Sequence, residues 1–130
     1  MKKDDIYNVI PKSVLKHIFD DFLLGIDSEI HGFYHWCRVL ENGLTISKQN
    51  SANIKVIIAF SFFHDIKREN ENDDPDHGLR GSELLYKYRK QVNLNKEEIK
   101  HNTDLLNKLL YVWSAVKHNC AKFAPDTELK

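Results

Sequence analysis

Apolar residues recur at helical spacing along most of the chain, and no stretch alternates between apolar and polar residues as a half-buried strand does. The first stripe follows Pro11 and stops near Gly25, with Ser13 as its expected N-cap. A second amphipathic helix is predicted from about Phe33 to just before Ser51. The pattern therefore predicts an all-α protein.

The stretch from Ser51 to Asp65 is apolar on nearly every side, with Lys55 as the only charge before Asp65. A helix without a polar face is normally buried, so we expect this third helix at the centre of the fold, with Ser51 as its cap. It ends in His64 and Asp65. Because unpaired buried charges are costly, such groups are usually paired or bound to metal.

The acidic run from 69 to 76 is typical of a solvated loop, except for its last residues. Asp76 is the expected N-cap of a fourth helix that His77 opens. From Asn95 to about Cys120 the pattern predicts one broken helix or two short ones, beginning with an Asn95–Glu98 capping box. Residues 1–130 are thus expected to form a single all-α domain, a compact bundle of five to six helices.

Charge and composition exclude several classes of protein. Lys plus Arg and Asp plus Glu number 19 each, so the net charge gives no case for nonspecific binding to nucleic acid. Two cysteines, Cys37 and Cys120, are too few for a disulfide framework, and both are expected to be small buried residues rather than nucleophiles. No signal-peptide pattern or run of about 20 apolar residues is present. A cytoplasmic, soluble protein without a membrane partner is expected, of open oligomeric state.

His35 and Arg38 lie together at the edge of the apolar side of the second helix. They could present a metal ligand and an anion-binding group to one cavity, although His35 taken alone is more typical of a partly buried histidine bonded to a backbone carbonyl. Lys67 and Arg68 are also near enough in sequence to hold an anion, but both are more typical of solvated charges at a helix end. His118 is either exposed or turned toward a second buried side, and the pattern leaves both alternatives open.

Histidine and carboxylate side chains delivered by successive helices are what a divalent metal site in a helical bundle requires. His35 on the second helix and the His64–Asp65 pair at the end of the third meet that requirement. Such ligands accept several ions, so Mn, Fe, Ni, Zn and Mg all remain candidates.

Three segments carry a resemblance to a known family: HGFYHWCRVLENG at 31–43, FFHDIKREN at 62–70 and DPDHG at 74–78. In this order the segments resemble the HD-domain superfamily of metal-dependent phosphohydrolases, and most of all its small stand-alone members. The resemblance implies that His35, His64 and Asp65 bind the metal. It also implies that His77 and His118 line the same cavity.

The expected activity is hydrolysis of a nucleotide or another small phosphate ester by a metal-activated water. Arg38 would hold phosphoryl oxygens, Asp65 would position the water, and His77 or His118 would transfer a proton.

The family pattern closes with a further aspartate ligand after the equivalent of His118, where this chain has only Asp126; Asp104 comes earlier in the order. The alternative is therefore a catalytically impaired HD-like module that binds a metal or a phosphorylated ligand for sensing or for interaction with a partner.

Overall fold

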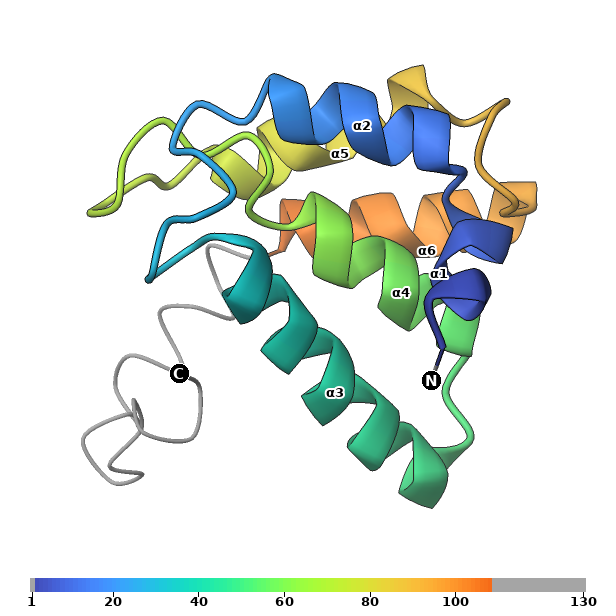
Figure 1. Ribbon diagram of the computed structural model, residues 1–130. Coiled ribbons are helices and arrows are strands. Elements are labelled where there is room, and N and C mark those ends of the chain that lie inside the picture. Colours follow the sequence, from blue (N-terminus) through green and yellow to red (C-terminus); the bar gives the residue numbers. More distant parts are fainter. Residues whose placement is uncertain (1, 109–130) are drawn as a thin grey trace.

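The computed structural model describes residues 2–108, which form six helices and no strand (Figure 1). The helices are α1 (Lys3–Val9), α2 (Lys12–Asp20), α3 (Phe33–Asn50), α4 (Ile54–Phe63), α5 (His77–Lys87) and α6 (Lys96–Asn107). The prediction of an all-α bundle of five to six helices is confirmed. None of the helices in residues 2–108 has both the length and the apolar character needed to cross a membrane.

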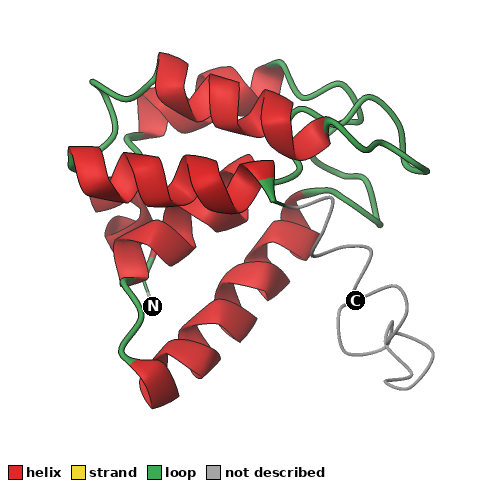
Figure 2. Cartoon of the chain, turned by 180° about the vertical axis from the view of Figure 1, so that it is seen from behind, coloured by secondary structure: helices red, strands yellow, loops and turns green. Residues whose placement is uncertain are grey.

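Helix α4 lies at the centre, as its apolar sequence predicts. It packs against α1, α3, α5 and α6. Seen from the opposite side, the described residues are again helices joined by loops (Figure 2). Phe62 and Phe63 are almost completely buried. Removing an aromatic side chain of this size from water contributes about 1.5–3 kcal/mol, so α4 is a main source of the stability of the bundle.

A cluster of aromatic rings fixes α3 against α2 and α4. Trp36 is fully buried, and its ring centroid lies 5.6 Å from that of Phe19, 5.0 Å from that of Phe22 and 6.4 Å from that of Phe62. These tilted and edge-to-face contacts are the arrangements that aromatic pairs prefer. Because Trp36 is anchored in this way, the preceding residue, His35, has a defined position at the edge of the core.

Two of the predicted helix caps are wrong. Pro11, not Ser13, precedes the first turn of α2. Ser51 ends α3 in the left-handed conformation with φ of 57°, and α4 is instead capped by Asn53, whose side chain accepts hydrogen bonds from the amides of Lys55 and Val56. Ser51 and Asn53 are both good capping residues, and the turn between the helices places only the second one correctly.

The predicted capping box at the start of α6 is confirmed and also joins α6 to α4. Asn95 Oδ1 accepts from the Glu98 amide at 2.8 Å, and Glu98 Oε1 accepts from the Asn95 amide at 2.9 Å. The Glu98 carboxylate also accepts from Asn53 Nδ2 at 2.7 Å and lies 3.4 Å from Lys55 Nζ. One carboxylate therefore connects the beginnings of two helices.

Replacing Glu98 by Gln is expected to remove part of the acid sensitivity of the fold. Burial opposes ionisation of Glu98, but its hydrogen bonds and Lys55 outweigh burial and lower its pKa below the usual 4.5. The ionised Glu98 carboxylate contributes about 1–3 kcal/mol to the free energy of unfolding through its hydrogen bonds. This contribution is fully present above pH 4.5 and is lost as the pH falls through the lowered pKa. Urea unfolding at pH 7 and at pH 3 measures the difference. Glu97→Gln, an exposed change in the same helical turn, should leave the pH dependence intact.

Helices α4 and α5 approach each other at the level of their backbones. A Cβ atom added to Gly81 of α5 would lie 2.3 Å from the carbonyl oxygen of Phe63 in α4. Only a residue without a side chain allows this approach. The close packing brings His77, at the start of α5, near the end of α4.

Candidate metal centre

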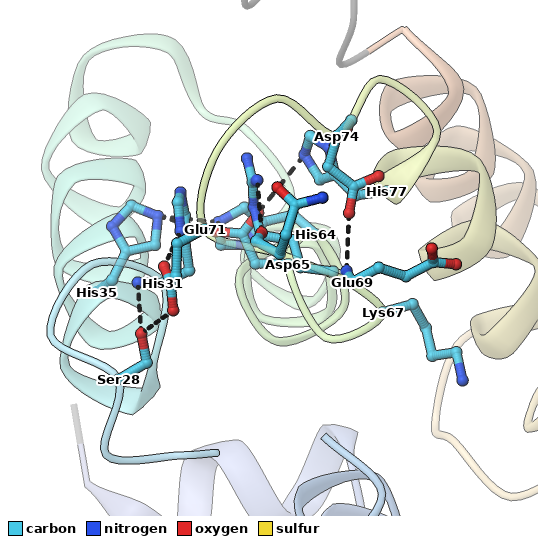
Figure 3. A network of polar contacts seen from close by, with 12 residues as sticks. Ser28, His31, His35, His64, Asp65, Lys67, Glu69, Glu71, Asp74 and His77 are labelled. Carbon is cyan, nitrogen blue, oxygen red and sulfur yellow. Dashed lines mark hydrogen bonds and ion pairs between the residues drawn. The ribbon is translucent and has the colours of Figure 1, made fainter. Parts of the chain in front are cut away.

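Three side chains from α3 and from the end of α4 converge on one point (Figure 3). His35 lies in the first turn of α3, His64 follows the last residue of α4, and Asp65 comes next. His35 Nε2 lies 3.2 Å from His64 Nε2 and 3.1 Å from Asp65 Oδ2. His64 Nε2 lies 3.0 Å from the same oxygen. The structure thus brings together the three residues that the sequence analysis proposes as metal ligands.

These distances fit donor atoms that share one ion. Nitrogen and oxygen ligands lie about 2.0–2.2 Å from a first-row metal such as zinc, and two neighbouring ligands around one ion are then about 3 Å apart. The chemistry of the set fits as well, because two imidazoles and one carboxylate accommodate most divalent first-row metals. The residues present are therefore compatible with a divalent cation.

The ring of His64 is oriented by its other nitrogen. Nδ1 lies 2.8 Å from the carbonyl oxygen of Ser61, to which it donates, so Nε2 faces Asp65 and His35. A metal-binding histidine commonly has its second nitrogen fixed in this way. His77 is held similarly, since its Nδ1 donates to the Asp74 carbonyl while Nε2 lies 3.5 Å from Asp65 Oδ1.

Arg68 forms an ion pair with the second carboxylate oxygen of Asp65, Oδ1. Its Nε donates to Asp65 Oδ1 at 2.9 Å, and only 6% of the Arg68 side chain is exposed. The prediction that Arg68 is solvated is wrong, whereas Lys67 is exposed as expected. The chain turns immediately after α4, with the Arg68 amide donating to the Asp65 carbonyl, and this turn folds the guanidinium back into the protein. There it also donates to the carbonyls of Asn70 and Asn72.

The cluster favours a charged pair over neutral groups. Burial opposes ionisation of Asp65, but His64, His35 and Arg68 outweigh it, and the pKa of Asp65 lies well below its usual value. Burial likewise opposes protonation of His64, but the Asp65 carboxylate together with backbone carbonyls outweighs burial and raises the pKa of His64. A metal ion would compete with a proton for His64, so its affinity should weaken as the pH falls.

A second histidine–carboxylate pair borders the cluster. Glu71 accepts from the Ser28 hydroxyl and lies 2.6 Å from His31 Nδ1, while the His31 ring packs edge-on against His35 at 5.8 Å between centroids. The contacts join the loop after α4 to the loop before α3, and Figure 3 shows Glu71 between them.

The acidic loop is thus less solvated than predicted. Besides Glu71, which is half-buried, Asp74 is buried and accepts from the Glu69 amide and from Arg80. The prediction of a solvated loop was wrong for Glu71 and Asp74. Each accepts hydrogen bonds from donors whose proximity is not apparent from the composition of the loop.

The other proposed residues have different positions. Arg38 is half-buried on α3, three residues after His35. His77 lies at the border of the cluster through its contact with Asp65. Asp104 is exposed on α6 and is not part of the cluster. His118, Cys120 and Asp126 lie outside the described residues.

Glu71 and His31 were not predicted to lie beside the site, and the buried ion pair of Arg68 with Asp65 was not predicted either. The ion pair of Arg68 could have been found from its spacing, because Asp65 and Arg68 are three residues apart across a helix end. Cys37 is half-buried, and burial raises the pKa of its thiol, which agrees with a packing role rather than a nucleophilic one.

Comparison of the chain with protein-family models, with curated proteins and with solved structures gave no match. The function of this protein is therefore inferred from the geometry of the cluster and from the sequence motifs.

Proposed function

We propose that this protein is a metal-dependent phosphohydrolase of the HD type that acts on a nucleotide or another small phosphate ester. His35, His64 and Asp65 would hold one divalent cation, with Mn, Fe, Ni, Zn and Mg as candidates. The observation that carries the proposal is the mutual approach of their three ligand atoms, which lie 3.0–3.2 Å from one another.

The surroundings of these residues support such a role. When bound, a divalent cation supplies Lewis-acid chemistry and makes hydroxide available near neutral pH. Arg68 keeps Asp65 ionised and fixes Oδ1, which leaves Oδ2 directed at the two imidazoles. Arg38 would contact phosphoryl oxygens, and His77, whose Nε2 faces Asp65, would contact the substrate or transfer a proton.

A second candidate function is a non-catalytic module that binds a metal or a phosphorylated ligand for sensing or for contact with a partner. It is favoured by the composition of the cluster, which within residues 2–108 contains Asp65 as its one carboxylate. An ion held by few carboxylates keeps more of its positive charge for binding an anionic ligand.

Elemental analysis followed by a hydrolysis screen tests both functions. Protein purified without added metal, and protein reloaded with each candidate ion, should contain about one ion per chain. Release of inorganic phosphate from nucleotides and small phosphate esters would support the enzyme. Stoichiometric metal without release of phosphate from any substrate would favour the sensing module. Failure to retain any of the ions would overturn the enzyme and the metal-binding form of the module.

A further inference from the structure

A second cavity lies at the far end of α5 from the candidate metal centre. It has a volume of about 530 Å³ and is lined by the end of α5, the α5–α6 connection and one face of α6. Figure 1 shows this connection on the opposite side of the molecule from the acidic loop that precedes α5. Tyr86 lies nine residues after His77, or about 14 Å along a helix that rises 1.5 Å per residue.

The lining of this cavity combines positive charge with apolar surface. Among residues 2–108, the charged residues that line it are all cations: Arg89, Lys90, Lys96 and Lys100. The other lining residues are Tyr86, Leu94, Ile99 and Thr103. Within the same described range no carboxylate contributes to the lining, although acidic and basic residues are equally numerous in the whole chain. Four cations around one cavity repel each other and attract an anion.

The cations are available for a ligand. Among residues 2–108, none of Lys90, Lys96 and Lys100 forms an ion pair with a carboxylate. Lys96 and Lys100 are one helical turn apart on α6, so they lie on the same face. Arg89 is already held in place, because it stacks on the Tyr86 ring at 4.0 Å and donates to the Tyr86 carbonyl.

We propose that this cavity is a second ligand site that binds a nucleoside diphosphate or triphosphate. Its volume is within the range of small-molecule sites, about 300–1,000 Å³. The lysines would contact the phosphates. The planar base would lie on the stacked Tyr86–Arg89 pair and on the apolar surface of Leu94 and Ile99. A bare phosphate would leave that apolar surface unused. The site is independent of the proposed function, since it shares no residue with the metal centre.

Fluorescence anisotropy of N-methylanthraniloyl-ADP in the presence of EDTA tests the proposal. The chelator prevents binding through a metal at His35, His64 and Asp65. The wild-type chain and a His64→Asn variant should bind the probe equally. The double variant Lys96→Gln/Lys100→Gln should weaken binding by about tenfold or more, because two charged contacts are lost. The matched control, Lys16→Gln/Lys48→Gln, removes two exposed charges elsewhere and should change the affinity by less than about twofold.

Competition separates the alternative ligands. Unlabelled ADP should displace the probe, whereas adenosine and pyrophosphate alone should each be at least about tenfold weaker. Equal losses in the two double variants would overturn the proposal. So would displacement by pyrophosphate as effective as by ADP, or a much stronger competition by a short single-stranded RNA. Absence of binding at about 1 mM probe would overturn it as well. Loss of binding only in His64→Asn would assign the nucleotide to the metal centre instead.

Discussion

Replacing His35 or His64 by Asn is expected to abolish stoichiometric metal binding and to lower phosphate release by about a hundredfold or more. The reason is that each residue supplies one of three converging ligand atoms, and loss of even an outer partner of a metal ligand typically costs 10–100-fold. Metal content per chain, measured after exhaustive dialysis, and initial rates of phosphate release are the two measurements. His35 is the safer position, because its side chain is 20% exposed and its replacement disturbs the core least.

Two exposed histidines provide matched controls for these variants. His17→Asn on α2 and His101→Asn on α6 remove an imidazole that is not part of the cluster. Both should keep the metal and the rate of the unmodified protein, and circular dichroism should show equal helix content in all four variants. Full metal content or full turnover in a correctly folded His35 or His64 variant would contradict the proposed centre.

Replacing Arg68 by Met is expected to destabilise the metal-free protein by about 3–5 kcal/mol. The change removes the guanidinium that pairs with Oδ1 of the buried Asp65, and breaking a buried pair by removing one member typically has an effect of this size. The carbonyls of Asn70 and Asn72 also lose a donor. Urea unfolding followed by circular dichroism, in the presence of EDTA, measures the free energy of unfolding.

The neighbouring Lys67 is the control for Arg68, because Lys67→Met removes a positive charge from an exposed position and should change stability by about 0.5 kcal/mol or less. A double-mutant cycle with Asp65→Asn isolates the pair, and its coupling energy should exceed about 1 kcal/mol. Additive effects of the two changes would show that Arg68 stabilises the loop through its backbone contacts alone.

Most of the helices could be predicted from the sequence, since each depends on periodicity along a single element. Helix α4 has no polar side, and therefore its central position and the burial of His64 and Asp65 followed directly. Periodicity placed His35 at the edge of the α3 stripe, and the order of the three sequence motifs grouped it with His64 and Asp65. That these residues bind a metal stays a prediction.

What could not be predicted depends on how the chain turns between elements. Arg68 and Glu71 are near the site because the loop after α4 folds back, and no periodic pattern describes such a reversal. Helix α1 is another example, since its seven residues are too few for a clear apolar stripe. Periodicity places Leu79 on the same apolar face of α5 as Leu85, and yet Leu79 is 47% exposed whereas Leu85 is fully buried.

The contact between Gly81 and the Phe63 carbonyl has a mechanical consequence. Side chains adjust to small changes by switching rotamers, but a backbone resting on a backbone has no such freedom. The methyl group of an alanine at position 81 would therefore push the first turns of α5 away from the end of α4. His77 is the first residue of α5, and Asp65 lies just after the end of α4. The distance between the His77 imidazole and the Asp65 carboxylate therefore depends on position 81 having no Cβ atom.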